Sequence, residues 1–181
     1  MYFMKINFFS LIITFLLFSG CDIQESIDNI TTFNITNSAE FTIPSSSGVN
    51  LPIDIASPDV NTSSQQSFEN NNTRADLVEE VSLNELTLTI TSPNDRTFSF
   101  LKSLEIYISN DSEGSTLLAE IQDIPENVGD ELQLETTGTN LIEYLKEDSY
   151  DLQFEAVTRE TVNSDTDISS EMVFEVKAST L

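Results

Sequence analysis

Residues 86–93 read Leu-Thr-Leu-Thr-Ile-Thr-Ser-Pro, and this stretch decides the class of fold. Its apolar residues, Leu86, Leu88 and Ile90, occupy every second position, and threonines fill the positions between them. A strict alternation rich in β-branched residues predicts a β-strand with one buried face and one face in water. Residues 92–95, Ser-Pro-Asn-Asp, are typical of a turn and end the strand.

The same period of two continues over most of the chain on both sides of this strand. Alternating apolar positions recur in residues 33–43, 51–55, 98–108, 117–121, 132–134, 150–156 and 168–178. Seven to nine short strands with one minor helix predict an all-β fold, a two-sheet antiparallel β-sandwich. The sequence has no tryptophan and one cysteine, so the core pin of antibody domains is absent. An immunoglobulin-like topology is one option among sandwiches.

Two segments depart from the alternating pattern. Residues 140–147 predict one short helix, with Asn140 as its N-cap and Glu143 at the third helical position, the spacing of a capping box. Residues 57–76 are polar and of low complexity, and Phe68 is their one large apolar residue. They predict a polar loop that is either a mobile excursion or pinned to the core by Phe68.

The beginning of the chain carries a different kind of signal. Lys5 precedes an apolar run over residues 6–18, and the small residues Ser19 and Gly20 lead to the only cysteine, Cys21. A positive segment, a short apolar core and a small-residue cleavage site predict an export signal rather than a folded element. The run is also short for a membrane span.

This segment resembles the lipobox of bacterial lipoproteins, in which a signal peptidase cuts before a cysteine that becomes lipid-modified. Phe18 stands where that family usually has leucine. The resemblance implies a signal peptide at 1–20, a lipidated tether at 21–31 and a sandwich domain at 32–181. Cys21 is then the lipidation site and the link to the membrane. The alternative to a lipoprotein signal is an ordinary secretory signal with an incidental cysteine. The start of translation is Met1 or Met4.

A second resemblance covers the region from about residue 83 to residue 178. It is carried by residues 86–93, 100–108 and 144–154, which resemble uncharacterised single-domain β-sandwich lipoproteins of Bacteroidetes-type bacteria. The likeness is a packing pattern without a functional motif. It implies the fold and a lipid-anchored place at the bacterial outer membrane or cell surface, and it transfers no site.

The charge of the chain excludes one class of partner. It has 31 acidic and 7 basic residues, a formal net charge of −24. Nucleic-acid binding needs clustered Lys and Arg to neutralise phosphates, and here the basic residues are scattered singly, so no nucleic-acid partner is expected. The acidity also repels an anionic lipid surface. Its plainest reading is a well-solvated surface.

The residue types exclude much of enzyme chemistry. There is no histidine, so histidine-based catalysis and most transition-metal sites are absent. Lipidation of Cys21 removes the thiol as a nucleophile or ligand. Residues 99–102 match a Ser-x-x-Lys string, but the other elements of that catalytic machinery are missing, which favours a turn entering a strand. We therefore predict no catalytic residue, no cofactor and no metal.

Weaker patterns leave alternatives open. Asn163, Asp165 and Asp167 have the spacing of a calcium loop, but the Gly and Glu that an EF-hand requires are missing, which favours a solvated turn. Residues 110–114 likewise favour a hairpin turn. Three tyrosines either form a carbohydrate platform or pack at a sheet margin with their hydroxyls in water: Tyr107, Tyr144 and Tyr150.

These observations favour a lipid-anchored, non-enzymatic envelope or surface lipoprotein that acts as a binding or accessory module. Its ligand would be an extracellular glycan or protein. The alternative is a structural or adhesion protein of the cell surface. A carboxylate-based glycosidase is a third and weaker reading, because no pair of acids stands out among 31.

Overall fold

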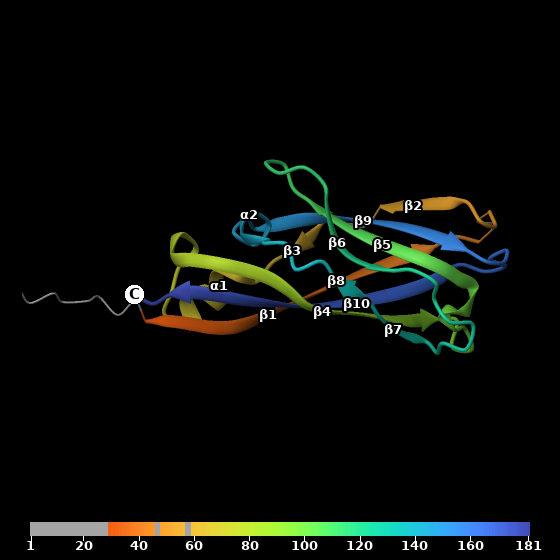
Figure 1. The fold of residues 1–181 in the computed structure, drawn as a ribbon, viewed down its shortest axis with the longest axis horizontal. Coiled ribbons are helices and arrows are strands. Elements are labelled where there is room, and N and C mark those ends of the chain that lie inside the picture. The colour runs from red at the N-terminus through yellow and green to blue at the C-terminus, as the bar shows by residue number, and fades with distance from the viewer. Residues whose placement is uncertain (1–28, 46–47, 57–58) are drawn as a thin grey trace, which may run out of the picture.

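The computed structural model describes residues 29–45, 48–56 and 59–181. Two antiparallel sheets pack face to face with the hydrophobic core between them (Figure 1), so the predicted β-sandwich is confirmed. Ten strands are assigned in the described residues. The predicted signal peptide and Cys21 lie outside the described residues.

The first sheet has four strands in the spatial order β1-β10-β4-β7. Its three long strands lie side by side, and a short one completes the sheet: β1 (Ile30–Ile43), β10 (Thr166–Ser179), β4 (Val78–Ser92) and β7 (Glu131–Gln133). All fourteen residues of β1 pair with β10 without a register shift, from Ile30 opposite Ser179 to Ile43 opposite Thr166. The first and last parts of the described chain are therefore neighbours.

The second sheet has the order β2-β9-β5-β6-β8, and β3 pairs with the beginning of β9. Its strands are shorter: β2 (Pro52–Ala56), β3 (Val60–Asn61), β5 (Leu101–Ser109), β6 (Thr116–Ile121), β8 (Glu135–Thr136) and β9 (Ser149–Thr158). A 3₁₀ helix, η3 (Phe98–Phe100), leads into β5. β2 and β3 pair with different parts of the same side of β9, so together they form an interrupted edge of the second sheet. Both contact β1 of the first sheet.

The core follows directly from the alternation in the sequence. Leu86 and Leu88 in β4 are fully buried and Ile90 is 7% exposed, which places one face of the threonine-rich strand inside. Across the two sheets the ring of Phe41 stacks on that of Phe154, with 3.8 Å between centroids. A one-residue slip of either strand would turn these rows to solvent, so the buried faces fix the register.

The segment 57–76 contains regular secondary structure where the sequence predicts a polar loop, and of the two alternatives the structure agrees with pinning by Phe68. Past residues 57–58, which lie outside the described residues, the segment contains β3, a helix α1 (Ser64–Asn70) and a 3₁₀ helix η2 (Ala75–Leu77). Phe68 is 1% exposed, and its ring meets that of Phe33 edge to face at 6.3 Å. One large side chain thus pins a polar helix over the inner face of β1.

The predicted helix after Asn140 exists but begins later. Helix α2 spans Ile142–Leu145, its N-cap is Leu141, and no capping box with Glu143 forms. The Asn140 side chain has a different role: its Oδ1 accepts hydrogen bonds from the backbone amides of Val81 at 3.2 Å and Ile142 at 3.3 Å. The asparagine therefore ties the helix to β4 instead of capping it.

The boundary of the domain also shifts slightly. Strand β1 begins at Ile30, inside the tether predicted for residues 21–31. No helix within the described residues is long and apolar enough to cross a membrane.

Candidate functional site

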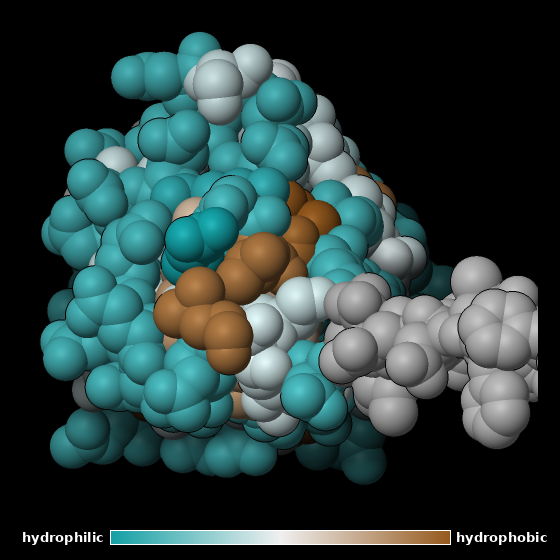
Figure 2. Space-filling model, turned by 90° about the vertical axis from the view of Figure 1, so that its left-hand side faces the viewer, coloured by the Kyte–Doolittle hydropathy of each residue, from teal (hydrophilic) through white to brown (hydrophobic). Residues whose placement is uncertain are grey.

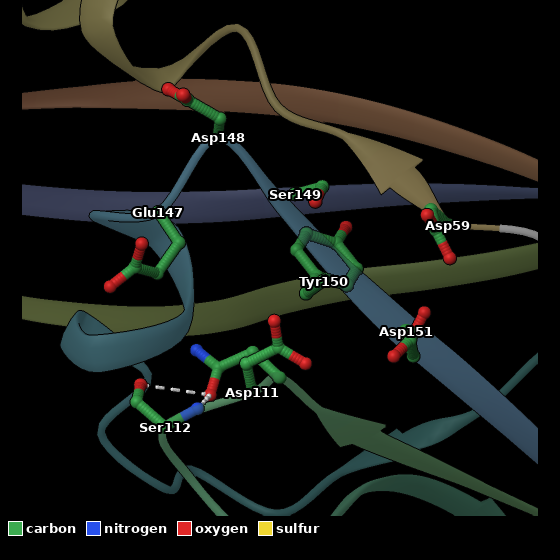
Figure 3. A pocket seen from close by; sticks show the side chains of 9 residues that line it. Asp59, Asp111, Ser112, Glu147, Asp148, Ser149, Tyr150 and Asp151 are labelled. Atoms are coloured by element: carbon green, nitrogen blue, oxygen red, sulfur yellow. Dashed lines mark hydrogen bonds between the residues drawn. The ribbon is translucent and has the colours of Figure 1, made fainter.

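A hollow of about 500 Å³ lies where three loops meet at one end of the second sheet. The loops come before β3, after β5 and between α2 and β9 (Figure 3). We call it the acidic hollow, and its lining is Asp59, Asn110, Asp111, Ser112, Glu147, Asp148, Ser149, Tyr150 and Asp151. A second hollow of about 470 Å³ between β1 and β3 shares Asp59.

Hydrogen bonds hold the three loops in place. Oδ1 of Asn110 accepts the amides of Ser112 at 3.1 Å and Glu113 at 2.6 Å, which closes the turn after β5. The Asn110 amide group also donates to the backbone carbonyl of Glu143 at 3.1 Å. On the other side, the amide of Thr62 donates to the carbonyl of Asp148 at 2.9 Å. Residues 110–114 are thus a turn, as the sequence predicts.

Tyr150 lies at the base of the acidic hollow, but its hydroxyl group points into the core. The amide of Asn37 donates to that hydroxyl at 3.1 Å, and the hydroxyl contacts Sδ of Met172 at 3.8 Å. Burial raises the pKa of Tyr150 well above its ordinary value, so the phenol stays neutral. Its polar end therefore serves the core and is not presented to a ligand.

Five carboxylates dominate the electrostatics of the acidic hollow, and two of them face each other. Asp59 and Asp151 point toward one another in Figure 3. The pKa of Asp151 is raised, first by the side-chain hydrogen bond with Asp59, then by desolvation, and then by the negative charges of Asp59 and Asp111. Two carboxylates that share a hydrogen bond retain a proton more readily. An anionic ligand such as a phosphate would be repelled here.

No group of three or more His, Cys, Asp or Glu residues in the described ranges is arranged to hold a metal ion. The calcium-like spacing at Asn163 serves the fold instead. Oδ1 of Asp165 accepts the amide of Ser45 at 2.7 Å, and Oδ1 of Asp167 accepts the hydroxyl of Thr42 at 2.7 Å. These two carboxylates tie β10 and the turn before it to the end of β1. The amide of Ser45 lowers the pKa of Asp165.

A second acidic feature crosses the outer face of the second sheet. Five carboxylates stand directly opposite one another on adjacent strands, and we call them the acidic row: Asp54 of β2, Glu155 of β9, Glu105 of β5, Glu120 of β6 and Glu135 of β8. Like charges in directly opposed cross-strand positions are destabilising. The Tyr107 hydroxyl donates to Glu105 at 2.6 Å. This hydrogen bond is the main reason why the pKa of Tyr107 is raised to about 12.

The three tyrosines do not form a platform. Tyr107 lies on the outer face of the second sheet, and Tyr150 is buried in the core. Tyr144 in α2 is 6% exposed and donates to the carbonyl of Gly114 at 2.9 Å. The expected margin position with the hydroxyl in water is wrong for Tyr150, whose hydroxyl is buried in the core. Tyr107 lies on the outer face of the sheet, where its hydroxyl donates to Glu105. At residues 99–102, Ser99 bonds Thr97 and Lys102 is exposed, as a turn entering a strand requires.

Sequence reasoning did not find the acidic hollow, because its carboxylates come from positions that are far apart in the chain. Asp59 belongs to a segment with too few apolar residues to predict β3, and Asp151 is one outward residue in an alternating strand. Asp111 lies in residues 110–114, whose sequence predicts a turn and nothing further. The one site that the sequence does predict, lipidation at Cys21, lies outside the described residues.

Comparison with known proteins adds little to these observations. No protein-family model matches the chain, and no curated protein matches it. Among solved structures, a chain titled Desmodium yellow mottle tymovirus is similar over 83% of this chain and 90% of its own length. The sequence identity is 13% and the TM-score is 0.31, so this likeness carries no argument about fold or function.

Proposed function

We propose that this protein is a lipid-anchored, non-enzymatic lipoprotein of the bacterial outer membrane or cell surface, and that its sandwich is a binding or accessory module. One observation carries the proposal: the only cysteine of the chain, Cys21, follows directly after the apolar run and the two small residues Ser19 and Gly20. A glycan or protein at the cell surface is the class of ligand that such a location makes accessible.

Two features of the described chain support a role without catalysis. The buried polar groups of the hollow are used for structure, since the Tyr150 hydroxyl bonds Asn37 and the loops bond one another. The carboxylates Asp59 and Asp151 are within hydrogen-bond reach of each other, whereas the two acids of a glycosidase are held farther apart, on either side of the bond that they cleave.

The test is metabolic labelling with a radioactive fatty acid in bacteria that express the wild type, Cys21→Ala or Cys21→Ser. We expect label in the wild type only, and accumulation of the unprocessed precursor in both variants. Label that persists in Cys21→Ala would refute lipidation at this residue. A Glu69→Ala variant, which leaves residues 1–21 unchanged, controls for loss of expression.

One observation favours the alternative, a structural or adhesion protein. β1 is an edge strand of fourteen residues, and within the described ranges only β10 pairs with it. It contains no proline or lysine and one charged residue, Glu40. Edge strands without such protection add strands from other chains. Sedimentation of the soluble domain separates the two functions: self-association that Thr36→Lys abolishes supports the structural role, and a monomer that binds on a glycan array supports the module.

A further inference from the structure

The end of the sandwich at which the described chain begins has an apolar surface. Asn29 and Thr180 are joined there by a backbone hydrogen bond of 2.9 Å, and the amide of Leu181 donates to Asn72 at 2.8 Å. The adjacent side chains of Ile30 and Leu181 are 58% and 76% exposed. Figure 2 looks onto this end and shows apolar side chains gathered near its centre, with hydrophilic residues around them.

We call this surface the apolar tip and define it by Ile30, Leu77 and Leu181, with Phe33 partly buried behind them. The side chains of its outermost segments carry no net charge, although the whole chain has a net charge of −24. Its outermost segments, residues 29–30, 71–77 and 179–181, contain one acid, Asp76, which forms an ion pair with Arg74 at 2.6 Å.

The next acids along the strand are also paired. Glu80 accepts a hydrogen bond from Lys177 at 2.9 Å, and Glu79 accepts one from Ser179 at 2.6 Å. The apolar tip can therefore approach a lipid surface without bringing an unpaired side-chain carboxylate of these segments against it. Exposed apolar side chains beside a neutral rim are suited to the interface between lipid headgroups and acyl chains.

The length of the tether decides which part of the domain reaches the membrane. Nine residues, 21–29, separate the proposed lipid on Cys21 from Ile30, and a fully extended chain of that length spans about 30 Å. The opposite end of the sandwich also exposes apolar residues, Val49 and Leu51. It lies beyond the far end of β1, about 45 Å from Ile30 for a fourteen-residue strand. The tether cannot turn that end to the membrane.

An orientation with a sheet face on the membrane is disfavoured by charge. The outer face of the second sheet carries the acidic row. The outer face of the first sheet carries Glu171 and Glu175 on β10. Desolvating such carboxylates against lipid costs free energy that the apolar tip does not incur.

We propose that the domain stands on the membrane end-on, with the apolar tip inserted at the lipid surface in which its own acyl chains are embedded. This inference rests on the proposed function, because it requires lipid on Cys21. The acyl chains supply the affinity, and the tip, held near the surface at high effective concentration, sets the orientation.

The absence of tryptophan from the chain makes the test direct. Leu181→Trp and Leu51→Trp place a single tryptophan at the two ends, at positions that are 76% and 62% exposed. Each lipidated full-length variant is purified from bacterial membranes and reconstituted into phosphatidylcholine vesicles. We expect emission from residue 181 to shift to shorter wavelength and to be quenched by lipids brominated in their acyl chains, and emission from residue 51 to remain unchanged.

Vesicle flotation in the same samples separates the two claims. Protein that floats with the vesicles but shows no shift and no quenching at residue 181, or equal quenching at both positions, overturns the end-on orientation and leaves the lipid anchor standing. Protein that lacks acyl chains and does not float overturns both. Ile30→Trp repeats the measurement at a second residue of the apolar tip, and equal unfolding midpoints for all variants exclude misfolding.

Discussion

Asp59 and Asp151 come from segments almost one hundred positions apart, and the pairing of β3 with β9 brings them together. Neither residue has a sequence neighbour that would mark it, so this contact was not predictable without the tertiary fold. Asn140 shows the limit in another way. Its type suggested a helix cap, but a neighbouring strand offered the amide of Val81, and the side chain bonds both.

The carboxylate pair makes stability depend on pH. The folded-state pKa of Asp151 is raised, so its contribution to stability is fully present below the unfolded value of about 3.8 and is lost as pH rises through the folded value. We expect Asp59→Asn to lower the pKa of Asp151 toward that value and to stabilise the domain at neutral pH but not in acid. Titration of the Asp151 carboxyl carbon by NMR measures this, with Asp148→Asn as a control that should change it little.

The side chain of Asn140 provides a second prediction at this scale. Asn140→Ala leaves two backbone amides without their acceptor and should cost about 1 kcal/mol. Glu143→Ala should change the free energy of unfolding by less than about 0.5 kcal/mol, since no capping box forms. Urea unfolding of both variants shows whether Asn140 ties the helix to β4 or forms a capping box with Glu143. A larger effect of the Glu143 substitution would support the capping box.

Among the elements, the strands were predictable and the short helix α1 was not. Apolar residues at every second position predict β4, β5, β9 and β10, because in each strand this row of side chains forms the buried face. Helix α1 has seven residues, two of them buried, and Phe68 is its only large apolar side chain. An isolated helix of that length is unstable, so its formation depends on Phe33 and the inner face of β1, which no local pattern reveals.

Docking of α1 through Phe68 is testable. Phe68→Ala removes a ring that is 1% exposed and should destabilise the domain by about 3–5 kcal/mol. The exposed neighbour gives the control, because Glu69→Ala should shift stability by less than about 0.5 kcal/mol. Equal midpoints in urea for the two variants would mean that α1 contributes little to the core.

The last strand should be equally necessary to the sandwich. Phe174 in β10 is fully buried against β1 and β4, so Phe174→Ala should cost about 3–5 kcal/mol, a large share of the stability of a small domain. Glu175→Ala, on the outer face, should cost less than about 0.5 kcal/mol. If chemical denaturation showed the Phe174 variant to be as stable as the Glu175 variant, β10 would be dispensable.

At the scale of the whole molecule, shape, charge and tether act together. The sandwich is long because β1, β10 and β4 each contain fourteen or fifteen residues, so its two ends are far apart. The net charge of −24 keeps its faces in water, and the apolar tip lies where the described chain begins. The sequence could predict the two layers, and it also predicts an anchor at Cys21, which lies outside the described residues. It could not predict that the apolar tip we propose to face the lipid forms at this end, because that depends on the pairing of β1 with β10.

The central claim, that the lipid on Cys21 anchors this sandwich, is tested most directly by the intact mass of the protein extracted from bacterial membranes with detergent. We expect a chain that begins at Cys21 and is heavier than residues 21–181 alone by the mass of a diacylglyceryl group, with or without a further acyl chain on the amino group. An unmodified chain that begins at another residue, or one that retains residues 1–20, would contradict it.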